Sequence, residues 1–227
     1  MIDLNSISSN YGVKIITLFI FWKIVKRHPN LKTVKKETAF SVYRSLLCLN
    51  FLLYSLENVI CNFSDLFTDP YQSRDCYNNV SDWFIVYTVF DLIKMVLSKN
   101  SRVDLYIHHI WCLGSFLISK SFGKCGAILN ASLLAEAISI VSGIDLIAME
   151  KDNMKESYYY KKYRKYVIKF FRLPLWILLL LITIKNTRKT PSLIWYNLIL
   201  SSIVMIGLDQ FWEKKCNKVI KKYKNET

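Results

Sequence analysis

Apolar residues gather in seven long runs, each bounded by charged or polar residues. The runs cover about 12–26, 39–61, 83–98, 103–119, 125–148, 166–185 and 192–212. Each is close to the roughly 20 residues that an α-helix needs to cross the hydrocarbon of a bilayer. The pattern predicts an all-α, multi-pass transmembrane helical bundle of about seven spans, or six spans if the short first run is discounted.

No internal repeat or Pro/Gly-rich linker divides the chain. We expect residues 1–35 to form a tail, a first transmembrane anchor and a basic loop, followed by one bundle over 36–224 and a basic tail over 213–227. The first run lacks the basic start and the small-residue cleavage site of a secretory signal, so it is interpreted as an uncleaved anchor.

Composition narrows the class of protein further. Hydrophobic residues make up 52% of the 227 residues, yet the formal net charge is +14. Apolar and basic segments must therefore alternate, which is typical of a small polytopic membrane protein. The run 176–184 consists almost entirely of large apolar residues, which a soluble nucleic-acid binder would not need, so no nucleic-acid partner is expected. The six cysteines lack paired metal-type spacing and no Gly-rich phosphate loop is present, so neither a metal nor a bound cofactor is expected.

Lys and Arg predict the orientation, because cytoplasmic loops retain basic residues during insertion. They crowd into the connections after the first, third and fifth runs and into the tail, whereas the other connections hold few. Seven spans then give a luminal N-terminus and a cytoplasmic C-terminus. The glycosylation sequons at Asn62 and Asn79 lie in the predicted luminal loop. Cys61 and Cys76 flank that loop, as a disulfide or as free thiols.

Ionisable residues inside the runs predict a site, because such side chains need a partner or a polar cavity at membrane depth. In the predicted orientation they share a band in the inner half of the bilayer. If they face inward, they form one cavity that opens to the cytoplasmic leaflet. The candidate lining residues are Arg44, Asp91, Asp104, His108, His109, Glu136 and Arg172.

Helical spacing relates these residues to one another. Asp104 and His108 are four residues apart, so they share a helix face and the carboxylate is expected to orient the imidazole. His109 is rotated by about 100° from His108, so both line one cavity only if it is wide. A structural interpretation stays open, in which Asp91 and Lys94 neutralise each other and the histidines only specify packing. Adjacent histidines are awkward partners for one ion, so no metal site is predicted.

Several motifs resemble the TLC-domain family of multi-pass membrane proteins (TRAM, Lag and CLN type). Tyr87-x-x-x-Asp91, on an aromatic-rich segment, is followed by the pair His108-His109, as in the family's central signature. The segment 133–139 around Glu136 and the Phe-Arg-x-x-Pro segment around Arg172 are similar to those of its small members, and Arg44-Ser45 sits where the family has an Arg and a Ser. The resemblance covers residues 36–224, which we therefore expect to be a TLC domain with a six-helix barrel around a polar cavity.

The resemblance implies two functions. The first is that of the small TLC proteins, which bind, sense or move membrane lipids or acyl chains in lipid homeostasis, in the endoplasmic reticulum or a related endomembrane. Arg44 and Arg172 suit a phosphate or carboxylate. The alternative is a ceramide-synthase-like acyltransferase with acyl-CoA as co-substrate, in which His108, His109 and Asp91 are catalytic. The helix after the histidines holds a single Glu136 where that branch has an acidic motif, which favours the first function.

The basic tail and the segment 158–166, in which tyrosines alternate with Lys and Arg, have a separate interpretation. Such residues at a membrane boundary suit an interfacial belt over anionic lipid. We therefore expect membrane lipids as the partners of this chain, with anionic lipid at the tail.

Overall fold

The computed structural model describes the backbone of residues 4–226 and the side chains of 11–187 and 189–223. The structure is 84% helical, and the described residues include no strand. The elements in chain order are α1 Leu4–Arg27, η1 Pro29–Leu31, α2 Lys36–Cys61, α3 Asp65–Thr68, α4 Asp75–Leu97, α5 Val103–Ser121, α6 Ala127–Ser132, η2 Leu133–Ile138, α7 Ser142–Glu150, α8 Met154–Val167, η3 Ile168–Arg172, α9 Leu173–Lys185, η4 Thr187–Lys189 and α10 Ser192–Glu226.

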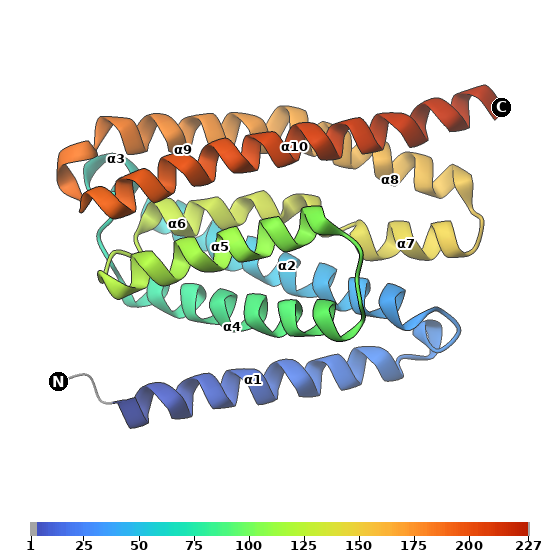
Figure 1. Ribbon diagram of the computed structural model, residues 1–227, viewed down its shortest axis with the longest axis horizontal. Coiled ribbons are helices and arrows are strands. Elements are labelled where there is room, and N and C mark those ends of the chain that lie inside the picture. The colour runs from blue at the N-terminus through green and yellow to red at the C-terminus, as the bar shows by residue number, and fades with distance from the viewer. Residues whose placement is uncertain (1–3, 227) are drawn as a thin grey trace.

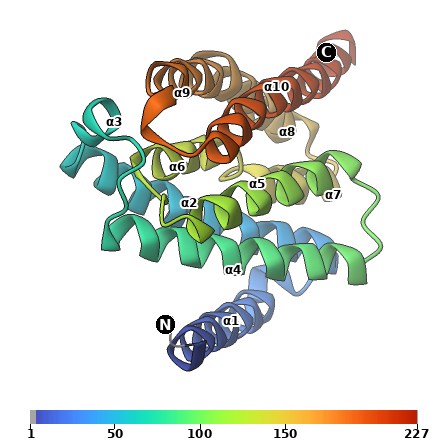
Figure 2. The same ribbon diagram turned by 60° about the vertical axis from the view of Figure 1, so that its left-hand side comes forward.

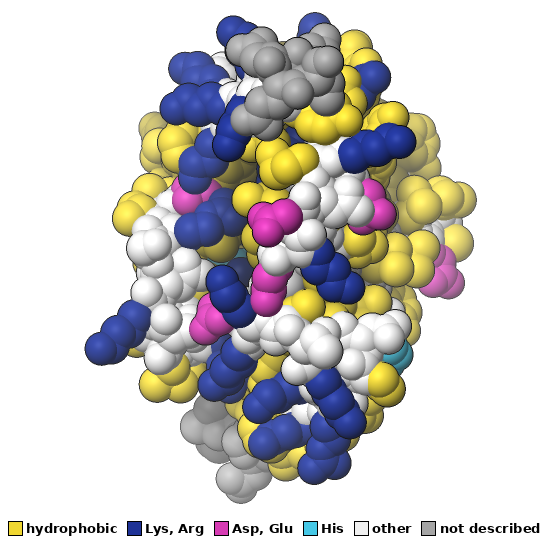
Figure 3. All heavy atoms as spheres, turned by 90° about the vertical axis from the view of Figure 1, so that its right-hand side faces the viewer, with side chains coloured by type: hydrophobic (Ala, Val, Ile, Leu, Met, Phe, Trp, Pro, Cys, Tyr) yellow, Lys and Arg dark blue, Asp and Glu magenta, His cyan; other side chains and the backbone are white. Residues whose placement is uncertain are grey.

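Long helical segments run back and forth between two ends of the molecule (Figure 1). The connections 28–35, 98–102 and 151–153 lie at one end with the C-terminus, and the connections 62–74, 122–126 and 186–191 lie at the other. Lys and Arg side chains crowd the first of these faces (Figure 3), which we call the basic end. The chain therefore alternates between a basic and a less basic end.

Four helical segments are long and apolar enough to cross a membrane: Lys36–Cys61, Ala127–Glu150, Met154–Lys185 and Ser192–Tyr223. Large apolar side chains cover their outer surfaces, as in Phe170 and Leu181, which are 64% and 58% exposed. Contiguous apolar surface of this kind is covered by lipid or by a partner in folded proteins. Among the described residues, α1, α4 and α5 do not meet the same criterion.

Helix α1 lies at the edge of the bundle, where it packs against α2 and α4 (Figure 2). Near the basic end, the indole of Trp22 meets the edge of the Phe40 ring at 5.1 Å, and Phe40 stacks on Tyr43 at 5.3 Å. Near the middle of α1, the buried Lys14 pairs with Asp82 at 3.7 Å. Aromatic and ionic contacts therefore hold the middle and the C-terminal half of α1 against the bundle.

The segment 125–148, expected as one helix, is broken after Ser132 into η2, a turn and α7. Ser45 of α2 explains the turn between η2 and α7. Its hydroxyl donates to the carbonyl oxygen of Ser139 at 2.9 Å and accepts from the Gly143 N–H at 2.9 Å. A side chain inserted into the backbone ladder in this way interrupts a helix. Gly143 permits the close approach, because a Cβ there would lie 2.5 Å from the Cα of Val42.

A second irregularity lies at Ile168–Arg172, where one turn of π-helix separates α8 from α9. Pro174, two residues after Arg172, has no N–H to donate to the preceding turn, so a regular α-helical ladder cannot continue through it. The π-turn accommodates the proline and sets the direction of Arg172.

All six cysteines are free thiols in the structure, including Cys61 and Cys76, which flank the connection between α2 and α4.

Candidate functional site

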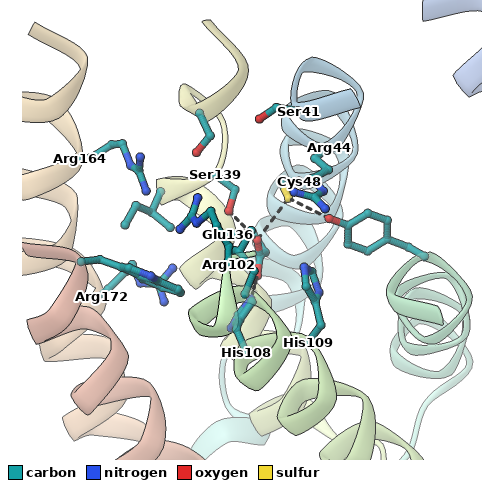
Figure 4. Close-up of a pocket in the computed structure, with 15 residues that line it drawn as sticks. Ser41, Arg44, Cys48, Arg102, His108, His109, Glu136, Ser139, Arg164 and Arg172 are labelled. Atoms are coloured by element: carbon teal, nitrogen blue, oxygen red, sulfur yellow. Dashed lines mark hydrogen bonds and ion pairs between the residues drawn. The ribbon is translucent and has the colours of Figure 1, made fainter. Parts of the chain in front are cut away.

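A small polar cavity lies among α2, α5, η2, η3 and α10, toward the basic end (Figure 4). Arg164 and Arg172 reach into it from one side and Arg44 from the other, while His108 and His109 rise from α5. We call it the arginine cavity. Its lining residues are Ser41, Arg44, Cys48, Tyr87, Arg102, Leu105, His108, His109, Glu136, Ile138, Ser139, Ser142, Arg164, Arg172 and Trp212.

Glu136 lies at the centre of this lining and is only 7% exposed. Its Oε1 is 3.6 Å from Nε2 of His108, and its Oε2 accepts hydrogen bonds from Cys48 Sγ at 3.2 Å and Ser139 Oγ at 3.0 Å. Three partners, from α5, from α2 and from the turn after η2, thus hold one buried carboxylate. The 3₁₀ geometry of η2 brings Glu136 and Ser139 onto the same side, since residues three apart eclipse one another there.

His109 has different surroundings from His108. Its Nε2 lies 2.8 Å from Asp91 Oδ2, and its Nδ1 is buried without a hydrogen-bond partner among the described residues. Asp91 is fully buried and also accepts a 2.6 Å hydrogen bond from Nε of Arg44. The Arg44 guanidinium lies over the Phe40 ring at 5.0 Å. The two histidines therefore pair with different carboxylates.

Arg172 is the most buried cation of the cavity, with 1% of its side chain exposed. Its Nη1 donates to the carbonyl oxygen of Ala135 at 2.7 Å, and its Nε donates to Asp209 Oδ2 at 3.1 Å. Its Nη2 is buried and has no partner among the described residues. The guanidinium also lies over the Trp212 ring at 5.2 Å. One of its donors therefore remains available.

Arg102 and Arg164 line the same cavity. Arg102 bonds to both oxygens of Asp104. Arg164 lies 3.7 Å from Asp145, and its Nε is buried without a partner among the described residues. Asp145 is also paired with Lys161 and accepts from Ser157 at 2.9 Å. Arg164 is thus only loosely paired.

The structure brings most of the predicted residues together. Arg44, His108, His109, Glu136 and Arg172 line the cavity, and Asp91 lies behind His109 and Arg44. Asp104 does not orient His108 as expected, because its oxygens accept from Arg102, from Trp212 Nε1 at 2.8 Å and from Lys215 at 3.3 Å. Asp91 and Lys94 do not neutralise each other, since Lys94 lies over the Phe90 ring instead.

Sequence reasoning missed Arg102, Arg164 and Asp209. The first two were assigned to basic connections, although both point inward at the basic end. Asp209 lies in the apolar run 192–212, where an ionisable residue indicates a site as strongly as at Glu136. Tyr87 was part of the motif that ends at Asp91 but was not predicted to line the cavity, and Cys48 was not predicted either.

The size of the cavity limits what it can hold. Its volume is about 70 Å³, and one water needs about 10–15 Å³ of such space. It therefore has room for about five water-sized atoms, the number of heavy atoms in a phosphate group and far fewer than in an acyl chain. No cluster of metal-ligating side chains occurs in the part of the chain that the structure describes.

Fold and site together define an all-helical protein with four candidate membrane spans and a buried, arginine-lined cavity. Comparison adds no family to this description, because no family model, curated protein or solved structure matches the chain.

Proposed function

We propose that this chain is a multi-pass membrane protein that binds the anionic head group of a membrane lipid in the arginine cavity and acts in lipid homeostasis by binding, sensing or moving that lipid. The observation that carries the proposal is the pair of buried guanidinium nitrogens, Arg164 Nε and Arg172 Nη2, that lack partners among the described residues and belong to two arginines that line one cavity.

Electrostatics support an anion. Four arginines line the cavity, whereas Glu136 is the single carboxylate of the lining. A buried donor without a partner costs about 1–3 kcal/mol. Oxygens of a phosphate or carboxylate would accept from both guanidinium groups, whose planar donors match such anions. An acyl chain exceeds the volume of the cavity, so only the head group would enter it, with the tails in the surrounding bilayer.

The wider assignment belongs to the same proposal. We infer a TLC-type bundle of seven spans, with α1, α4 and α5 crossing the membrane beside the four apolar segments, in the endoplasmic reticulum or a related endomembrane. The alternation between a basic and a less basic end supports seven crossings with a luminal N-terminus and a cytoplasmic C-terminus. The motifs around Tyr87, His108, Glu136 and Arg172 support the family.

A blocking substitution tests head-group binding. Leu105 lines the cavity, so Leu105→Trp would fill it, whereas Ile107, 45% exposed on the same helix, provides the matched control Ile107→Trp. Native mass spectrometry of the detergent-solubilised protein would compare phosphatidic acid with diacylglycerol, which has the same tails and no phosphate. We expect binding of phosphatidic acid alone, and at least a fivefold loss in Leu105→Trp only. Equal binding of both lipids, or unchanged binding by Leu105→Trp, would overturn the proposal.

One observation favours acyl transfer as a second candidate function. His109 lines the cavity, its Nδ1 is buried without a hydrogen-bond partner among the described residues, and Asp91 lies against the opposite ring nitrogen. A histidine held in this way is suited to act as a general base toward an amine or hydroxyl. Under this alternative, acyl-CoA would be the acyl donor.

A further inference from the structure

A second and larger pocket opens at the basic end, between α1, α2 and α4. Its volume is about 310 Å³, more than four times that of the arginine cavity. We call it the α1 pocket. It is lined by Trp22, Lys36, Glu37, Phe40, Arg44, Lys94, Leu97, Ser98 and Asn100.

Positive charge in and around the α1 pocket is not balanced by carboxylates. Lys36, Lys94 and Arg44 line it against Glu37, and Lys23 and Lys26 are close enough to repel the Lys94 ammonium group. Arg44 is paired with Asp91, but no ion pair of the four lysines occurs among the described residues. Lysines that converge without counter-charges attract an anion. Dark blue side chains crowd the same part of the basic end, toward the lower edge of Figure 3.

Two largely apolar grooves lie along either side of α1. The groove between α1 and α4 is lined by Tyr11, Ile15, Ile85, Val86, Val89, Phe90, Ile93 and Leu117, and its volume is about 370 Å³. The groove between α1, α2 and α4 has a similar volume and is lined by residues such as Leu18, Phe21 and Phe51. On α4, Ile93 of the first groove directly precedes Lys94 of the pocket. A basic pocket with two apolar grooves matches the layout of a two-tailed lipid.

We propose that an anionic glycerophospholipid with a phosphorylated head group binds beneath α1, with its head group in the α1 pocket and its tails in the two grooves. Clusters of four or more basic residues at the cytoplasmic end of a membrane helix attract such lipids. The roomy pocket suits a bulky head group such as an inositol phosphate. This site is separate from the arginine cavity, with which it shares the Arg44 side chain. It rests on the membrane orientation proposed above, but not on head-group binding in the arginine cavity.

Charge substitutions at the α1 pocket test this proposal. Native mass spectrometry of the full-length protein in detergent would measure binding of phosphatidylinositol 4-phosphate and of phosphatidylcholine. The variant Lys36→Gln/Lys94→Gln would be compared with Lys218→Gln/Lys221→Gln, which removes the same charge from the exposed end of α10. We expect at least a fivefold loss of phosphatidylinositol 4-phosphate in the pocket variant only. Equal losses in both variants, or equal binding of phosphatidylcholine, would overturn the proposal.

Two further experiments distinguish binding of a lipid from binding of a soluble anion, and this site from the arginine cavity. Val89→Phe would fill the groove between α1 and α4, and Ile184→Phe, on the exposed face of α9, is its control. We expect Val89→Phe to weaken binding of the whole lipid and to leave soluble inositol 1,4-bisphosphate unaffected. Soluble head group that binds as tightly as the lipid would overturn the assignment to a lipid. Leu105→Trp should leave this site intact, so failure at one site is distinguished from failure at the other.

Discussion

Arg172 and Ala135 are joined by a 2.7 Å hydrogen bond from a side-chain nitrogen to a backbone carbonyl oxygen. Both residues lie in irregular segments, Arg172 in the π-turn and Ala135 in the 3₁₀ segment. Irregular backbone inside a membrane bundle is stable where neighbouring side chains satisfy its polar groups. Arg172 therefore stabilises the broken segment that carries Glu136, while its Nη2 remains without a partner among the described residues.

The pair of Arg172 and Asp209 allows stability to be separated from ligand binding. Arg172→Met should lower the free energy of unfolding by about 3–5 kcal/mol, because it leaves Asp209 buried without its partner. The double variant Arg172→Met/Asp209→Leu should recover much of that loss, since no buried charge remains. Thermal unfolding in detergent measures the first effect. Phosphatidic acid binding should be lost in both variants, and its retention in the double variant would contradict a ligand role for Arg172.

The two histidines distinguish lipid binding from acyl transfer. Expression in cells that lack ceramide synthase should leave ceramides and free long-chain bases unchanged, for the wild type and for His108→Ala and His109→Ala alike. Quantitative lipid mass spectrometry checks this. Ceramide that forms with the wild type and disappears in His109→Ala would establish the acyltransferase instead, with His109 as the base beside Asp91.

Gly143→Ala tests the close packing of α2 on α7. A Cβ at this position would lie 2.5 Å from Val42 Cα and 2.7 Å from Val42 N, which are backbone atoms that cannot move aside cheaply. We expect a loss of about 1–3 kcal/mol. Gly207→Ala is the control, because no atom lies within 4 Å of its added Cβ and alanine favours a helix over glycine by about 1 kcal/mol. Similar melting temperatures for the two variants would contradict the packing described here.

The connection after α2 contains an ion pair whose contribution to the stability of the fold depends on pH. Arg74 donates hydrogen bonds of 2.6 and 2.9 Å to Asp65, and they lower the pKa of the Asp65 carboxyl from its usual value. A depressed pKa stabilises the fold above the unfolded-state pKa of about 3.9, and this stabilisation disappears as the pH falls through the folded-state pKa. Asp65→Asn should therefore melt below the wild type at pH 7, and the gap should close on acidification below about pH 4.

A control in the same loop makes this test specific. Asp69→Asn removes a carboxylate for which no ion pair occurs among the described residues. Its difference from the wild type should be small and should vary little over the same pH range. A gap for Asp65→Asn that stays constant down to pH 3 would contradict a contribution from the charged carboxylate.

Glycosylation checks the orientation of the chain. Asn62 is half-buried at the end of α2. Asn79, expected in a loop, is exposed on the first turns of α4, and both residues lie toward the less basic end. A luminal position of that end predicts an endoglycosidase-sensitive shift in gel mobility that Asn79→Gln, alone or with Asn62→Gln, abolishes. The sequon at Asn225, whose side chain lies outside the described residues, would be modified only if the basic end faced the lumen.

Sequence predicted the helices better than the contacts between them. Charged residues bound each apolar run, so the seven predicted segments agree with the long helical segments to within a few residues at most ends. The turn between η2 and α7 was not predictable from its own segment, because its cause, Ser45, lies on another helix. The partner of Asp104 was misjudged for a similar reason. Spacing along one helix identifies His108 as its neighbour, whereas Trp212 and Lys215 approach it from α10.

Helix α10 has a length that exceeds what a bilayer requires. Its 35 residues, at about 1.5 Å each, extend about 50 Å, whereas the hydrocarbon core is about 30 Å thick. If α10 crosses the membrane, roughly 20 Å of it projects into the water beside α8, where Tyr158 stacks on Tyr223 at 4.7 Å. The C-terminal part of α10 would then stand above the head groups with α8 rather than lie flat on them. Its basic surface would be accessible to a partner in the aqueous phase.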